Sequence, residues 1–217
     1  MIDVPPESQV HKQVVRKRAE VLDITLNPST RIYYDEVEEP DMHNPSGDLE
    51  RLVAALESQW QLNNIQADFS ILPQMQPILR EGGWNVTCAV HHADADSDPQ
   101  IIHLWPGLYE GTIYGMAVDL GSTTIAAHLT DLRTGEVAAS SGIMNPQIRF
   151  GEDLMSRVSY AMMNPGGDVE MTTAVRTALN ALIGTLQAEA GIVPQQIMEA
   201  VFVCNPVMHH LLLGIDP

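Results

Sequence analysis

Hydrophobic and polar residues alternate regularly in the first third of the chain. Between residues 31 and 37 the alternation of apolar and polar positions predicts a strand, which the acidic, proline-containing segment 38–41 should end. Apolar residues then recur every three or four positions, as on one face of a helix, at Leu49, Leu52, Val53 and Leu56. Ser46 or Asp48 is expected to cap this helix.

Helix-like and strand-like patterns continue to residue 106. A second short helix is predicted around residues 72–79 and should stop at Gly82-Gly83. Two further strands are predicted at 86–90 and 101–104, where apolar residues alternate or run together. Residues 31–108 should therefore form a small α+β domain with its helices on one side of a sheet. Residues 1–30, which mix prolines with polar residues, should form a linker.

A different order of elements is predicted after residue 114. An apolar strand leads into the tight turn Asp-Leu-Gly-Ser-Thr-Thr at 119–124, and two more strands follow, the last at 136–140. Helices are predicted at 152–163 and 169–190, and another strand at 200–204. The second half of the chain should thus begin with a β-meander and end with helices and one added strand.

The turn at 119–124 contains the residue types that phosphate binding requires. Gly121 lets the backbone come close to a phosphate, and successive N–H groups together with the hydroxyls of Ser122, Thr123 and Thr124 can donate hydrogen bonds to it. Asp119 can hold Mg²⁺ through a water molecule, because a carboxylate beside a phosphate needs a cation between them. The alternative is a plain hairpin in which Gly-Ser only reverses the chain.

Composition narrows the function classes. The chain has 217 residues and a formal net charge of −17, which opposes binding to nucleic acid or to an anionic membrane surface. No leader pattern and no 18-residue apolar run is present, so a cytoplasmic location is expected. The two cysteines, Cys88 and Cys204, are too few for a zinc or iron–sulfur site and are expected to be buried.

Other binding motifs are absent or weak. The sequence contains neither a Walker A motif nor a G-x-G-x-x-G dinucleotide motif. His91, His92, Asp94 and Asp96 have a spacing that could bind a metal, although their acidic setting also fits a solvated turn.

A longer motif resembles a known family. Residues 144–158 read Met-Asn-Pro-Gln-Ile-Arg-Phe-Gly-Glu-Asp-Leu-Met-Ser-Arg-Val, and 201–215 contain Cys-Asn-Pro-Val-Met-His. Together with the turn at 119–124, these segments closely resemble the ATP-dependent reductive activators of corrinoid proteins. The N-P-Q-x-R-[FY]-G-x-D-[VL] pattern is far more distinctive than the turn. Cys204 stands where that family usually has glycine.

The resemblance implies an α/β fold: an α+β middle domain at 31–108, followed by the first lobe of an actin-like, ribonuclease-H-like ATPase domain at 109–217. It also implies ATP and Mg²⁺ as cofactors, a corrinoid protein as partner, and homodimers formed through the middle domain. The family returns Co(II) corrinoid to Co(I) for methyl transfer. Its [2Fe–2S] ferredoxin domain has no ligands in this chain, which is expected to lack that domain and the C-terminal part of the ATPase domain.

The resemblance adds five candidate residues that face nucleotide or a partner: Asn145, Gln147, Arg149, Asp153 and Asn205. Read from the sequence alone, the polar residues of 145–153 could equally hydrogen-bond locally as a helix cap. Only one lobe of an ATP-binding cleft is encoded, so weak or no ATP affinity is expected for this chain by itself.

Two other function classes share some of these features. A sugar- or acid-kinase-like phosphotransferase would share the Asp119 turn but not the N-P-Q-x-R-F-G-x-D segment. A non-catalytic module that dimerises or docks a corrinoid protein would need only residues 31–108.

Overall fold

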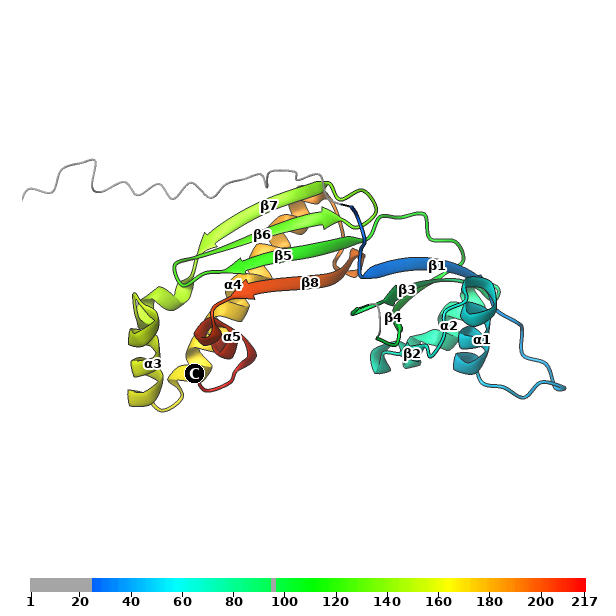
Figure 1. Cartoon of the computed structure of the whole chain (residues 1–217), viewed down its shortest axis with the longest axis horizontal. Helices are drawn as coiled ribbons and strands as arrows, with labels where there is room; N and C mark the ends of the chain where they lie inside the picture. The colour runs from blue at the N-terminus through cyan, green and yellow to red at the C-terminus, as the bar shows by residue number, and fades with distance from the viewer. Residues whose placement is uncertain (1–24, 95–96) are drawn as a thin grey trace, which may run out of the picture.

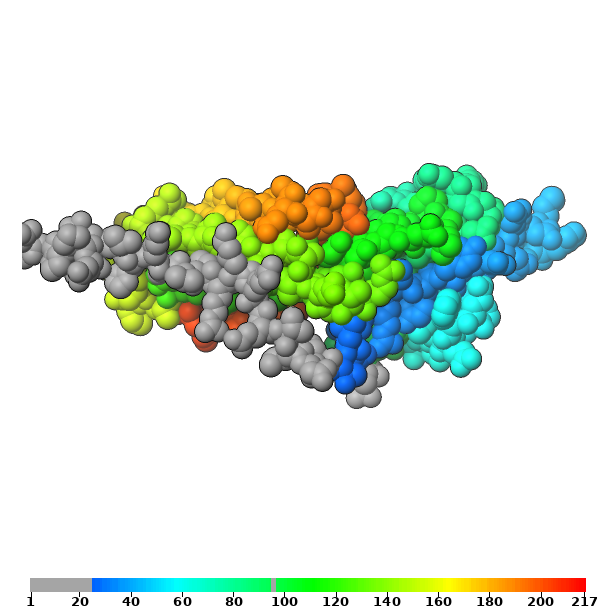
Figure 2. All heavy atoms as spheres, turned by 90° about the horizontal axis from the view of Figure 1, so that it is seen from above, coloured from blue at the N-terminus to red at the C-terminus, as the bar shows by residue number. Residues whose placement is uncertain are grey.

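The computed structural model describes residues 25–94 and 97–217 and places them in two four-stranded sheets, each with its own apolar core (Figure 1). The two sheets follow one another along the long axis of an elongated molecule, which the view from above also shows (Figure 2). The chain is therefore a mixed α/β protein, as its sequence predicts. Within the described residues, no helix has the length and hydropathy that crossing a membrane requires.

The first sheet has the strand order β1-β3-β4-β2, with bounds Thr30–Glu36, Asn85–His91, Gln100–Pro106 and Gln66–Ala67 respectively. Helices α1 (Asp48–Trp60) and α2 (Leu72–Glu81) pack against this sheet and against each other. Their apolar stripes bury Leu52, Leu56 and Leu79 completely, because these side chains fall on the face turned to the strands. The strands and helices predicted between residues 31 and 106 are all present.

Two local details of this part differ from the prediction. The N-cap of α1 is Gly47, not Ser46 or Asp48, because the Ser46 hydroxyl donates to the side chain of Asn44 (2.9 Å). The short strand β2, which pairs in parallel with β4, was not predicted, since two residues show no periodicity.

The second sheet has the strand order β7-β6-β5-β8, with bounds Val137–Met144, Thr124–Asp131, Tyr114–Leu120 and Ile197–Cys204 respectively. Short turns join β5, β6 and β7, so these strands are antiparallel, whereas β8 returns after the helices and runs parallel to β5. Strand β7 is longer than predicted and extends to Met144, because it pairs with β6 along its length.

Helices cover one face of this sheet. Helix α4 (Gly167–Ala190) lies along it, and the 3-10 helix η3 (Pro146–Phe150) and α5 (Pro206–Leu213) pack against α4. Helix α3 (Leu154–Met163) packs against η3 and α4 beyond the ends of the strands (Figure 1), and the 3-10 helix η4 (Pro194–Gln196) precedes β8. Helix α4 supplies most of the helical side of the core, through Met171, Val175, Leu179, Leu182 and Leu186. Along β5, Val118 and Leu120 are buried in this core, while Ala117 and Asp119 are exposed on the other face. Cys88 is buried as predicted, but Cys204 is only half-buried.

The two sheets are joined by polar contacts as well as by the chain. The Thr30 hydroxyl donates to the Glu199 carboxylate (2.7 Å) and lies 3.0 Å from Nδ1 of His91. The side chain of Gln196 donates to the carbonyl of Thr112 in the connection between the sheets (3.0 Å). Strand β8 of the second sheet is thereby tied to β1 and β3 of the first.

Candidate functional site

The candidate site is the tight turn between β5 and β6. The Gly121 N–H donates to the Thr124 carbonyl (3.0 Å), which leaves Ser122 and Thr123 as a two-residue loop. A Cβ atom on Gly121 would lie 2.7 Å from the Thr124 carbonyl oxygen, closer than real Cβ contacts come. Glycine is therefore required here by the close approach of two backbone segments.

Three successive carbonyl groups of this turn accept hydrogen bonds from the helical side of the sheet. Asn145 donates twice, from its side-chain amide to the Gly121 carbonyl (2.8 Å) and from its backbone N–H to the Thr123 carbonyl (2.8 Å). Between them, the Arg157 guanidinium donates to the Ser122 carbonyl. All three carbonyls of the loop thus point toward Asn145 and Arg157.

This arrangement determines where the amide groups of the loop point. In a trans peptide the N–H of one residue points opposite to the C=O of the residue before it. The N–H groups of Ser122 and Thr123 therefore point away from Arg157 and Asn145. Neither has an acceptor among residues 25–94 and 97–217, so both can donate to a ligand at the exposed side of the turn.

Asp119 lies at the end of β5, two residues before Gly121, with its side chain exposed. It is on the face of the sheet that the helices do not cover, as its alternation with the buried Val118 and Leu120 shows. Free amides, hydroxyls and an accessible carboxylate are the donor set that a phosphate with hydrated Mg²⁺ would need. The residues present therefore fit that group, with Asp119 as the residue that would hold the cation.

Arg157 was not predicted as a site residue, yet it is the largest fully buried side chain of the described residues. It is wholly buried, and its guanidinium contacts the Gly151 carbonyl (3.0 Å), the Gln147 side chain (3.5 Å) and the Met208 sulfur (3.2 Å) as well as Ser122. A signal was present in the sequence. Arg157 falls on the same helix face as Leu154 and Val158, where a charged residue is out of place.

Two predicted site residues do not face a ligand or partner. Asn145 and Gln147 are each only 1 % exposed, so their proposed surface role is wrong. Asn145 supports the turn and caps η3 by accepting from the Gln147 N–H (2.9 Å), while the side chain of Gln147 donates to the Met171 carbonyl in α4 (3.0 Å). Their polar groups are used inside the fold, because a buried amide needs hydrogen-bond partners.

Two others are helix caps. Asp153 caps α3 by accepting from the Ser156 N–H (2.7 Å), and this bond lowers the pKa of its carboxyl group. Asn205 caps α5 by accepting from the Met208 N–H (3.0 Å). The local-cap alternative therefore describes Asn145 and Asp153, and Asn205 caps a helix as well, which was not predicted.

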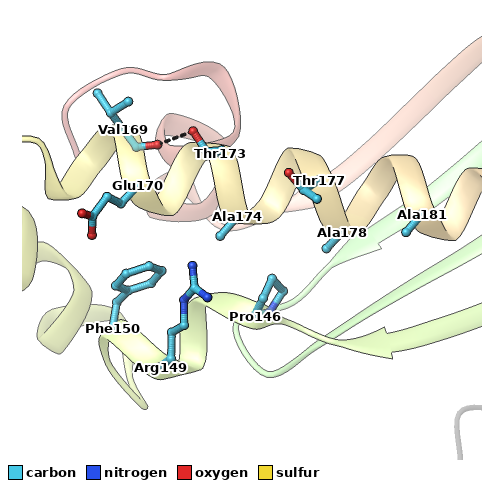
Figure 3. A pocket seen from close by; sticks show the side chains of 10 residues that line it. All are labelled: Pro146, Arg149, Phe150, Val169, Glu170, Thr173, Ala174, Thr177, Ala178 and Ala181. Atoms are coloured by element: carbon cyan, nitrogen blue, oxygen red, sulfur yellow. Dashed lines mark hydrogen bonds between the residues drawn. The ribbon is translucent and has the colours of Figure 1, made fainter.

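Arg149 is exposed, as Asp153 is, but it caps no helix. Its guanidinium lies over the ring of Phe150, 4.6 Å from the centroid. Both side chains and Pro146 form one wall of an open groove whose other wall is α4, from Val169 to Ala181 (Figure 3). Arg149 is thus separate from the donors that hold the turn at 121–124.

The predicted metal spacing at His91 is not supported by the part of the chain that the structure describes, in which no three potential metal ligands come together. His91 instead contacts Thr30, and His92 lies 3.4 Å from the Tyr33 hydroxyl. Asp96, the last member of that pattern, lies outside the described residues.

Comparison with known families gives two adjoining matches. Residues 19–111 match the RACo linker region, and residues 114–217 match the RACo middle region. These family names differ from the sequence-based prediction of a middle domain at 31–108 and part of an ATPase domain at 109–217. The boundaries of those two domains remain predictions.

Individual relatives agree with these matches. The corrinoid activation enzyme RamQ of Eubacterium limosum is 32% identical over 108 residues, which are 50% of this chain and 18% of RamQ. A solved reductive activator for corrinoid, iron-sulfur protein superposes with a TM-score of 0.78 and 32% identity, covering 93% of this chain and 32% of the activator. The chain thus spans less than a third of either relative. Both regions are matched in order and the fold is shared, so the chain belongs to the RACo family, of which it contains the linker and middle regions.

Proposed function

We propose that this chain is part of an ATP-dependent reductive activator that returns a Co(II) corrinoid protein to Co(I). The reaction adds one electron to cobalt. Its donor would be a [2Fe–2S] centre outside this chain, because Cys88 and Cys204 cannot ligate a cluster by themselves. Family membership supports this function over a phosphotransferase. The proposal includes the cytoplasmic location expected from the sequence.

The main support for the proposal is that the N–H groups of Ser122 and Thr123, which have no acceptor in the described chain, lie beside the exposed Asp119. In this role the two amides and the hydroxyls of Ser122, Thr123 and Thr124 would bind phosphate oxygens of ATP, and Asp119 would hold hydrated Mg²⁺. ATP binding and hydrolysis would supply the free energy for electron transfer to the corrinoid. The residues of this chain contribute phosphate binding and cation placement.

Titration of the ¹⁵N-labelled chain with Mg·ATP tests the phosphate site. We expect the amide resonances of Ser122 and Thr123 to shift, with a dissociation constant of about 1 mM or weaker, roughly −4 kcal/mol. The affinity should be weak because a nucleotide cleft needs two walls. Asp119→Ala should weaken binding of Mg·ATP more than binding of inorganic phosphate.

The turn at the other end of β6 is an internal control. There the N–H groups of Arg133 and Thr134 already donate to the Asp131 carboxylate (2.7 and 3.2 Å), so their resonances should not move. Equal shifts at both turns, or none at Ser122 and Thr123, would contradict the phosphate site.

The proposal also includes a corrinoid protein as partner and homodimers formed through residues 31–108. Size-exclusion chromatography with light scattering would detect the dimer, and a monomeric mass at all concentrations would exclude it. Co-elution with a corrinoid methyl carrier in the Co(II) state would demonstrate docking.

A further inference from the structure

Arg157 is a buried cation that forms no salt bridge within the described residues, although the charge of Asp153 acts on it at longer range. Its side chain is fully buried, and each hydrogen bond that it donates goes to a neutral acceptor. No carboxylate of the described residues lies within salt-bridge distance of its guanidinium. Burying an unpaired charge is costly, and a site that requires only neutral hydrogen bonds could use an amide or a hydroxyl.

The neighbouring Asn145 shows that a neutral donor suffices to hold the turn. Its amide binds the Gly121 carbonyl at 2.8 Å, in the same manner as Arg157 binds the next carbonyl along the chain. Arg157 differs in that its guanidinium joins four acceptors and carries a charge. That charge acts on the Ser122 carbonyl in addition to the hydrogen bond that holds it.

The peptide between Ser122 and Thr123 connects the buried guanidinium to the exposed side of the turn. Its C=O accepts from Arg157, and its N–H, which belongs to Thr123, points the opposite way and has no acceptor in the described chain. A charge-assisted hydrogen bond to a carbonyl polarises the whole peptide and makes its N–H a stronger donor.

We infer that Arg157 is a positioning residue for the phosphate site: it orients the Ser122–Thr123 peptide and, through it, directs a polarised Thr123 N–H at the bound phosphate. This inference rests on the proposed phosphate site and extends it to a residue that does not touch the ligand.

Three variants of the 217-residue chain test the inference by NMR titration with Mg·ATP. R157Q keeps a hydrogen-bond donor but removes the charge, and we expect a loss of affinity of roughly tenfold, the size of one charge-assisted hydrogen bond. R157K keeps the charge and should recover most of that loss. R133Q, the control, removes an exposed arginine at the far end of β6, roughly 26 Å of strand away, and should bind like the unaltered chain.

The outcomes separate the two proposals. Absence of any shift in the unaltered chain would overturn the phosphate site, and the inference with it. If the unaltered chain shows the shifts, and the folded R157Q variant binds Mg·ATP within about twofold of the affinity of the unaltered chain, only the role of Arg157 is overturned. An R157K variant as weak as R157Q would also overturn it, because the charge would then not matter.

A second measurement needs no folded R157Q. The Ser122 N–H follows a carbonyl bound by the neutral Asn145, whereas the Thr123 N–H follows one bound by the guanidinium. Base-catalysed hydrogen exchange in the ligand-free chain, corrected for sequence, should therefore be faster at Thr123, because positive charge makes an N–H more acidic. Equal corrected rates at the two amides would contradict the inference.

Discussion

At the scale of single residues, Asp35 is the carboxylate that the fold accommodates least well. It is completely buried, and neither oxygen has a hydrogen-bond partner in the described chain. Burial raises its pKa from 3.8 to about 6. The nearby Cys88 thiol and Trp60 indole lower this pKa by less than burial raises it. The indole N–H donates to the Tyr34 carbonyl and not to Asp35. The folded state therefore binds a proton more tightly than the unfolded chain does.

This shift predicts pH-dependent stability. Because the folded pKa is the higher one, the free energy of unfolding should fall as pH rises from about 4 to about 6 and then level off. Asp35→Asn should remove this fall and raise the free energy of unfolding at pH 7 by about 1–3 kcal/mol. Urea denaturation between pH 4 and 8 measures both, with the exposed Glu110→Gln as control. The same pH dependence in Asp35→Asn and the unaltered chain would show that Asp35 is not responsible.

Gly121 predicts a second effect at this scale. Alanine there would press its Cβ to 2.7 Å from the Thr124 carbonyl, so Gly121→Ala should destabilise the chain by about 1–3 kcal/mol and abolish the Mg·ATP shifts. Gly184 in α4 has no atom within 4 Å of its Cβ position, and Gly184→Ala should stabilise the chain by about 1 kcal/mol. Thermal denaturation of the two variants should thus shift in opposite directions, and shifts of the same sign would contradict the steric argument.

At the scale of elements, helix α5 connects its own cap to the candidate site. Asn205 caps it, and the sulfur of Met208 in its first turn contacts both Arg157 and Asn145. Asn205→Ala should lower the free energy of unfolding by about 1 kcal/mol and change the amide shift of Thr123 as well. Asn180→Ala, at an exposed position inside α4, is the control: it should leave the Thr123 shift unchanged and should not lower the free energy of unfolding, because alanine favours a helix more than asparagine does. A loss of stability without any change at Thr123 would show that α5 does not support the turn.

At the scale of the whole molecule, the contact of Glu199 with Thr30 ties the second sheet to the first. Glu199→Ala should cost about 1 kcal/mol. It should also raise hydrogen exchange in β1, which lies at the junction, more than in α4. The exposed Glu189→Ala in α4 is the matched control. Unchanged exchange in β1 would mean that the contact of Glu199 with Thr30 does not hold the two sheets together.

Most of the elements could be predicted from the sequence, because periodicity of 2 or 3.6 reports which face of a segment is apolar. Helix α2, which spans Leu72–Glu81 and ends at Gly82, agrees with its pattern, and so does the meander around Gly121. The residue types for phosphate binding were also visible in the turn at 119–124. The position of β8 beside β5 could not be predicted from the sequence, because strand order depends on contacts between distant segments.

The amino-acid sequence by itself determined the α/β class, the elements and the chemistry available at the turn. Only the tertiary structure decided which polar groups are used inside the fold. Asn145 reaches a carbonyl 24 residues away and Arg157 one 35 residues away. Periodicity describes neighbours along one element and contains no information on which distant group a side chain will meet. Burial therefore turned Asn145 and Gln147 from expected surface residues into supports of the core, and brought Arg157 beneath the turn.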